Sequence, residues 1–198
     1  GDVYKRQILE DEGAQIGVVQ GIQGMRWFDL VLTGTAAHTG STPMGMRRNA
    51  LLGMAQVIAG IDRIAKAHDG AVGTIGYLDI SPNSHNVIPG EVRATIDLRH
   101  PSDAVLDVIE AEVAALAAET AAGAGLDQRL VPISRTAAVA FDADCIASVR
   151  AGAQAAGFST RDIISGAGHD AAHAAAVAPT TMIFVPCAGG LSLSLIHI

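Results

Sequence analysis

Apolar and polar residues alternate most regularly between residues 91 and 99. Every second residue there is apolar, which is the period of a strand with one buried face. Three other stretches alternate less strictly, but they are rich in β-branched and aromatic residues that favour strands. The four predicted strands cover residues 25–33, 72–80, 91–99 and 126–134.

Between these strands, apolar residues recur at spacings of three and four, as on one face of a helix. This pattern predicts helices over residues 47–68 and 101–122. A Ser-Thr-Pro step at 41–43 provides a candidate cap and a proline suited to a first helical turn. Gly123 and Gly125 are placed to end the second helix.

The resulting order is strand, helix, strand, strand, helix, strand. This order is typical of a ferredoxin-like βαββαβ unit, an antiparallel sheet with both helices on one face. Such a unit can close its own core, and we expect it to span residues 25–135.

The flanking segments, 8–24 and 136–192, show a different pattern. Short apolar strands at 160–164 and 180–185 alternate with helices at 142–156 and 169–176, which predicts part of a parallel α/β sheet. We expect the βαββαβ unit to be inserted into this larger domain, with hinges at Gln23-Gly24 and near Thr136.

The two ends are expected to be adapter-derived sequence. Residues 2–7 and 193–198 can be encoded by DNA strings that are reverse complements of each other. We therefore exclude residues 1–7 and 193–198 from the fold, and expect an internal piece of a longer reading frame.

Composition excludes several function classes. A formal net charge of −7 with 4% aromatic residues argues against a nucleic-acid-binding surface. No stretch approaches the roughly 20 apolar residues of a membrane helix. The two cysteines, Cys145 and Cys187, form no CxxC pair and are expected to be reduced thiols in a cytoplasmic protein.

His38 stands among small residues on a predicted strand-to-helix corner, where Gly40 permits unusual backbone angles. An imidazole can donate or accept a proton near neutral pH, but a solvated loop histidine beside a capped helix is the alternative interpretation. His169 follows Ser-Gly-Ala-Gly and opens a predicted helix, where free N–H groups suit developing negative charge. His173, four residues later, lacks the glutamate of a zinc-protease helix, so a metal-binding pair is not favoured.

Three further residues are candidate substrate contacts. Asn86 lies in a predicted loop over residues 81–89, just before an apolar pair, and its amide can both donate and accept, as an amide or ureido group requires. Arg99 ends a predicted strand and can hold a carboxylate through two hydrogen bonds, although a surface ion pair is the alternative. Arg26, next to the first hinge, contacts either the substrate or the hinge itself. His85 and His100 are interpreted as structural or solvated.

Three motifs occur in a fixed order along the chain: Gly21-Ile22-Gln23-Gly24 with Arg26-Trp27 and His38-Thr39-Gly40-Ser41-Thr42-Pro43-Met44; Asn83-Ser84-His85-Asn86 with Asp97-Leu98-Arg99; and Ser165-Gly166-Ala167-Gly168-His169-Asp170. With these motifs the chain resembles the dinuclear-metal amidohydrolases. That group contains the N-carbamoyl-L-amino-acid hydrolases, allantoate amidohydrolase and β-ureidopropionase, and is related to aminoacylases and metallopeptidases.

The resemblance implies a lid (dimerisation) domain inserted into a metallohydrolase catalytic domain. It also implies that His38 reaches the partner's active site in a homodimer, and that Asn86, Arg99 and His169 contact a small ureido acid. Two divalent metal ions (zinc, manganese, cobalt or nickel) are implied too, with ligands outside residues 8–192. The piece itself is then expected to be inactive. An aminoacylase- or peptidase-like relative, or a non-catalytic dimerising module, remains the alternative.

Overall fold

The computed structural model describes residues 8–186. The residues expected to be adapter-derived, 1–7 and 193–198, and Cys187 lie outside this range. The described chain forms two compact units: Gly24–Thr136, here called the lid, and residues 8–23 together with 137–186, here called the flanking unit.

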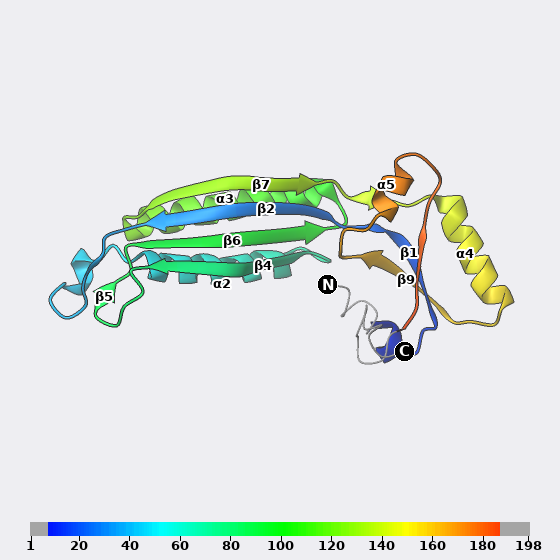
Figure 1. Ribbon diagram of the computed structural model, residues 1–198, viewed down its shortest axis with the longest axis horizontal. Coiled ribbons are helices and arrows are strands. Elements are labelled where there is room, and N and C mark those ends of the chain that lie inside the picture. Colours follow the sequence, from blue (N-terminus) through cyan, green and yellow to red (C-terminus); the bar gives the residue numbers. More distant parts are fainter. Residues whose placement is uncertain (1–7, 187–198) are drawn as a thin grey trace. The chain divides into compact units, whose positions relative to one another are not determined.

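The lid is a four-stranded antiparallel sheet covered on one face by two helices (Figure 1). Its strands lie in the order β4-β6-β2-β7, so the first and third strands of the unit are neighbours. The predicted βαββαβ fold is confirmed. The elements are β2 (Gly24–Thr33), α2 (Ala50–Ala67), β4 (Val72–Ser81), β6 (Glu91–His100), α3 (Asp103–Ala124) and β7 (Asp127–Thr136).

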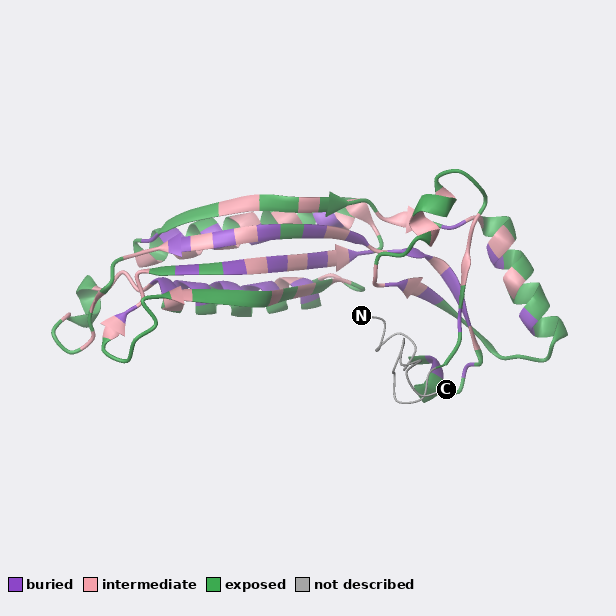
Figure 2. Cartoon of the chain, viewed as in Figure 1, coloured by how far each residue is buried: buried purple, intermediate pink, exposed green. Residues whose placement is uncertain are grey.

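Alternation along β2 and β6 determines which face the helices cover. Even-numbered residues from Arg26 to Leu32 on β2 and from Val92 to His100 on β6 are buried, as Figure 2 shows along both strands. These side chains pack against the apolar stripes of α2 and α3, which include Met54, Val57, Leu106, Ile109 and Val113. Burial of this apolar area is the main stabilisation of the lid.

Helix α2 begins later than the Ser-Thr-Pro step suggests. Asn49 is its N-cap, and the Asn49 side chain accepts hydrogen bonds from the backbone N–H groups of Leu51 and Leu52. The prediction that Ser41 or Thr42 caps this helix is therefore wrong. Residues Met44–Met46 form a separate 3-10 turn, η1, because the capping asparagine lies downstream of them.

A small sheet extends from one end of the lid. Strand β3 (Ala37–His38) pairs antiparallel with β5 (Val87–Ile88), placing His38 opposite Val87. We call this pair, with the loops over residues 39–46 and 82–86, the lid tip (Figure 1). The sequence predicted a plain loop at 81–89, because two-residue strands are too short to show alternation.

The flanking unit is built around β1 (Ile16–Ile22). Strand β9 (Thr160–Ser165) pairs parallel with β1, as predicted. However, β8 (Val139–Ala140) and β10 (Met182–Phe184) pair antiparallel with it. The sheet is therefore mixed, and the prediction of a parallel sheet is wrong for these two strands.

The helices of the flanking unit differ in how well they were predicted. Helix α4 (Ala143–Ala155) begins at its N-cap Asp142, as predicted. Helix α5 (Ala171–Ala175) is shorter than predicted and leaves His169 in the preceding turn. No helix among residues 8–186 has the length and apolar character needed to cross a membrane.

Candidate functional site

His38 is exposed at the lid tip, with a defined orientation. Its Nδ1 accepts hydrogen bonds from the backbone N–H groups of Gly40, at 3.1 Å, and Ser41, at 3.3 Å. A ring nitrogen that accepts two N–H donors carries no proton, so the proton of the neutral imidazole lies on Nε2. His38 therefore presents an N–H donor, which suits polarisation of a carbonyl oxygen.

Gly40 allows this arrangement through its small size. It has no positive φ, so the backbone freedom expected of it is not used. A Cβ atom at this position would instead lie 3.2 Å from Cε1 and 3.5 Å from Nδ1 of the His38 ring. The missing side chain is what lets the imidazole rest against the turn.

Asn86 lies beside His38 in the tip. The backbone N–H of Thr39 donates to the Asn86 carbonyl at 3.0 Å, which joins the two segments. The exposed Asn86 side chain accepts a hydrogen bond from Ser84 Oγ at 3.0 Å through Oδ1. The structure thus brings two candidate residues together that are 48 positions apart in sequence.

Arg99 lies at the opposite end of the lid. It pairs with Met25 on β2, next to the boundary between the two units, and lies eight residues beyond Glu91 along β6. At about 3.3 Å per residue, that separation is roughly 26 Å. A small substrate held by Arg99 therefore does not reach His38 or Asn86 of the same chain, an arrangement that sequence spacing did not show.

Arg99 forms a two-pronged ion pair with Asp97 on the helix-free face of the sheet. Its Nε donates to Asp97 Oδ1 at 2.9 Å, and its Nη2 donates to Oδ2 at 2.7 Å. Hydrogen bonding to this carboxylate raises the pKa of Arg99 above its ordinary value. The guanidinium is a permanent, oriented cation, as recognition of a carboxylate requires.

The same face is hollowed beside Asp97. A cavity of about 460 Å³ is lined mainly by β2, β4 and β6, with Ile133 of β7 at its border. Trp27 lies opposite Asp97 on the neighbouring strand and is 41% exposed. Asp97 and Trp27 belong to the sequence motifs but were not candidate site residues, because their neighbourhood depends on strand register.

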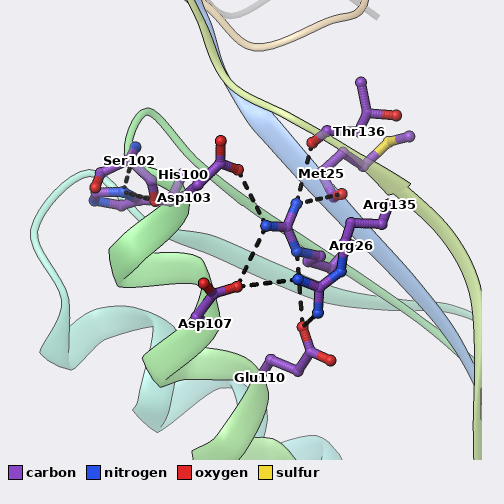
Figure 3. Close-up of polar contacts among 9 residues, drawn as sticks. All are labelled: Met25, Arg26, His100, Ser102, Asp103, Asp107, Glu110, Arg135 and Thr136. Atoms are coloured by element: carbon purple, nitrogen blue, oxygen red, sulfur yellow. Dashed lines mark hydrogen bonds and ion pairs between the residues drawn. The ribbon is translucent and has the colours of Figure 1, made fainter.

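Arg26 is buried and belongs to an ion-pair cluster at the start of α3 (Figure 3). Its side chain is 4% exposed, and Nη2 lies 3.1 Å from Asp103 Oδ1. Its Nη1 donates to the carbonyls of Met25 and Thr136, at 3.2 and 3.1 Å. Asp107, Glu110 and Arg135 complete the cluster.

Through these contacts Arg26 joins the strands that enter and leave the lid. The prediction of Arg26 as a substrate contact is not supported, since a cationic side chain buried among carboxylates is not presented to a ligand. The anchoring role, left open as the alternative, fits the structure.

His169 lies in the flanking unit, exposed in the turn before α5. Ser165 is fully buried at the end of β9, and its Oγ donates to the Ala167 carbonyl at 3.1 Å, which shapes this turn. His173 is exposed on α5. Within residues 8–186, no group of three His, Cys, Asp or Glu side chains is placed to hold a metal ion. The described residues thus offer no donor set for a metal centre.

His100 is structural, as interpreted from the sequence. Its Nδ1 accepts from the Ser102 N–H at 2.9 Å, which leaves Nε2–H to donate to the Asp69 carbonyl at 3.0 Å. The ring is 8% exposed and ties the β6–α3 connection to the α2–β4 turn. His85 is exposed in the loop before β5.

Residues 24–136 form a compact α/β unit of βαββαβ topology, inserted in the sequence between the two segments of the flanking unit. The chain belongs to the peptidase dimerisation domain family, whose model matches residues 20–124. It is 46% identical over 186 residues to an N-carbamoyl-L-amino-acid amidohydrolase of Rhizobium meliloti, and 32% identical over 194 residues to the allantoate amidohydrolase of Escherichia coli (strain K12). Each alignment covers 93% of this chain and 45% of the relative.

A solved structure shows the same relationship. The crystal structure of a hydantoinase/carbamoylase-family amidase from Burkholderia multivorans matches with a TM-score of 0.91 and 48% identity, over 93% of this chain and 45% of that one. The resemblance to the amidohydrolase group is confirmed. The chain spans a little under half the length of these relatives.

Proposed function

We propose that the protein containing this chain hydrolyses the C–N bond of N-carbamoyl (ureido) amino acids or of allantoate. The names of its relatives support this activity. The lid carries groups that suit such a substrate: a cationic fork for its carboxylate, and donors for its ureido group.

The observation that carries the proposal is the separation of Arg99 from His38 and Asn86. Because these residues lie at opposite ends of one lid, a complete site requires two copies. We propose a homodimer in which Arg99 of one protomer and the lid tip of its partner contact the same substrate. Two equivalent sites then form in a twofold dimer.

In this arrangement each residue has a distinct task. Arg99 holds the substrate carboxylate, and the Nε2–H of His38 donates to the carbonyl oxygen as it gains negative charge. The Asn86 amide contacts the ureido group, and His169 contributes a further hydrogen bond. The family resemblance also implies two divalent metal ions, zinc, manganese, cobalt or nickel. Since residues 8–186 offer no donor set, we assign no step to them here.

Mixed dimers test the composite site. At substrate concentrations near the wild-type KM, full-length His38→Ala and Arg99→Ala proteins are each expected to show little activity as homodimers. A hybrid has one site with both residues intact and one with neither, so random association restores roughly a quarter of wild-type activity. No restoration in proven hybrids would show that both residues act within one chain, contrary to the proposal.

Substrate and metal dependence are tested separately. Ammonia release from N-carbamoyl amino acids and from allantoate by the full-length protein, with N-acetyl amino acids for comparison, separates a ureido hydrolase from an aminoacylase-like relative. Activity that survives exhaustive chelation would contradict metal dependence. A cytoplasmic location is proposed with this activity.

The chain of 198 residues is proposed to act on its own only as a non-catalytic dimerising module. The match to a dimerisation-domain model over residues 20–124, and a lid that closes its own core, favour this second function. Sedimentation equilibrium of the 198-residue chain tests it, with a monomer at micromolar concentration as the contrary result.

A further inference from the structure

Arg47 spans the loop that follows His38. Its Nε donates to the carbonyl of Thr42 at 3.0 Å, and its Nη2 donates to the carbonyl of Thr39 at 2.6 Å. One planar guanidinium thus holds the first and last residues of a four-residue segment at a fixed separation. The Thr42 N–H donates in turn to the His38 carbonyl at 3.2 Å, which closes the turn.

The segment held by Arg47 contains the two donors that orient His38. Gly40 and Ser41, whose N–H groups point at Nδ1, lie between Thr39 and Thr42. Restricting the backbone of one residue costs about 1–2 kcal/mol. Two neighbouring N–H groups in an exposed loop therefore need a further stabilising contact to stay directed at the same acceptor, Nδ1 of His38. Arg47 is half-buried and supplies that support through main-chain contacts alone.

We propose that Arg47 is a positioning residue that sets the tautomer and direction of the His38 imidazole. By bracing residues 39–42, it keeps two N–H donors on Nδ1 and so keeps the proton on Nε2. Arg47 touches no substrate in this scheme. The catalytic consequence rests on the proposed function, whereas the ordering of His38 does not.

Arg48 provides a matched control. It is the next residue, and its replacement removes the same charge. Its guanidinium, however, donates to the Gly125 carbonyl and lies 3.2 Å from Asp127 Oδ2, at the α3–β7 connection. Arg48→Ala therefore perturbs net charge without touching the loop after His38.

Nuclear magnetic resonance of the 198-residue chain tests the ordering directly. In Arg47→Ala, we expect the Gly40 and Ser41 amides to exchange with solvent at least about tenfold faster. We also expect the nitrogen shifts of His38, in mildly alkaline buffer, to move from a single Nε2–H tautomer towards a mixture. Arg48→Ala should match the wild type in both.

Arg47→Lys separates the loss of the two carbonyl contacts from a general loss of folding. A lysine keeps the charge but lacks the fork that reaches two carbonyls, so it should reproduce the fast exchange in a folded lid. Unchanged exchange and an unchanged tautomer in both Arg47 variants would overturn the proposal.

The effect of Arg47 on catalysis is measured in the full-length enzyme. Arg47→Lys should lower kcat about tenfold or more with a smaller change in KM, whereas Arg48→Ala should retain activity. If the His38 ring loses its order but kcat is unchanged, the positioning role stands and the proposed role of His38 in catalysis fails.

Discussion

The Nδ1 atom of His38 lies 3.1 Å from the backbone nitrogen of Gly40, and a Cβ atom at residue 40 would lie 3.2 Å from Cε1 of the same ring. This relationship links the smallest residue of the loop to the orientation of its titratable group. It predicts that adding one methyl group at residue 40 acts on the imidazole and not on the lid core.

Gly40→Ala is expected to lower kcat of the full-length enzyme by about tenfold, because the His38 ring has to shift by a few tenths of an ångström to accommodate the Cβ, which weakens its hydrogen bonds. The free energy of unfolding of the lid, measured with urea, should stay within about 0.5 kcal/mol of the wild-type value. Gly45→Ala is the control, since a Cβ there meets no atom within 4 Å. Equal activities of the two variants would contradict the proposed orientation of His38.

Arg99→Ala is expected to raise KM for ureido acids by about 100-fold, because the substrate carboxylate loses its cationic partner. The effect should be small for an analogue in which an amide replaces that carboxylate. Arg93→Ala is the matched control: Arg93 lies on the same face of β6, paired with Asp29, at the tip side of the strand. A comparable loss in both variants would indicate a general charge effect.

Arg26→Ala is expected to destabilise the lid by about 2–3 kcal/mol, measured by urea unfolding of the 198-residue chain. The change removes the buried cation that Asp103, Asp107 and Glu110 share. Partial exposure of these carboxylates keeps the cost below that of a fully buried pair. Lys66→Ala, which breaks the exposed Lys66–Asp62 pair, should cost at most about 0.5 kcal/mol.

Asp142 predicts an acid dependence confined to the flanking unit. Its carboxylate accepts the Cys145 N–H at the start of α4, which lowers the pKa of Asp142 below its ordinary value. A depressed folded pKa gives stability that is present above the unfolded value and lost as pH falls through the folded one. Relative to Asp142→Asn, wild type should therefore lose thermal stability below about pH 4. A constant difference in Tm between pH 7 and pH 3 would contradict this.

Much of the lid could be predicted from its sequence. Residues alternate strictly from Glu91 to His100, and apolar residues recur at spacings of three and four along α2 and α3. In these elements the apolar residues are the buried ones, so the pattern in the sequence identifies both the element and its buried face. Elements without such a repeat were missed: β3 and β5 have two residues each, and pairing with one another is what defines them. The start of α2 was misplaced because Ser41, Thr42 and Asn49 all suit a cap, and only backbone geometry selects Asn49.

By itself, the sequence determined the βαββαβ order, the family and the residue types of the candidate site, since these depend on local periodicity and on motifs. Only the tertiary structure decided that Arg26 is a buried anchor and that Arg99 lies far from His38 within one lid. Both outcomes depend on strand register and strand length, which place residues in space through pairing between distant segments. Sequence order alone does not contain those distances.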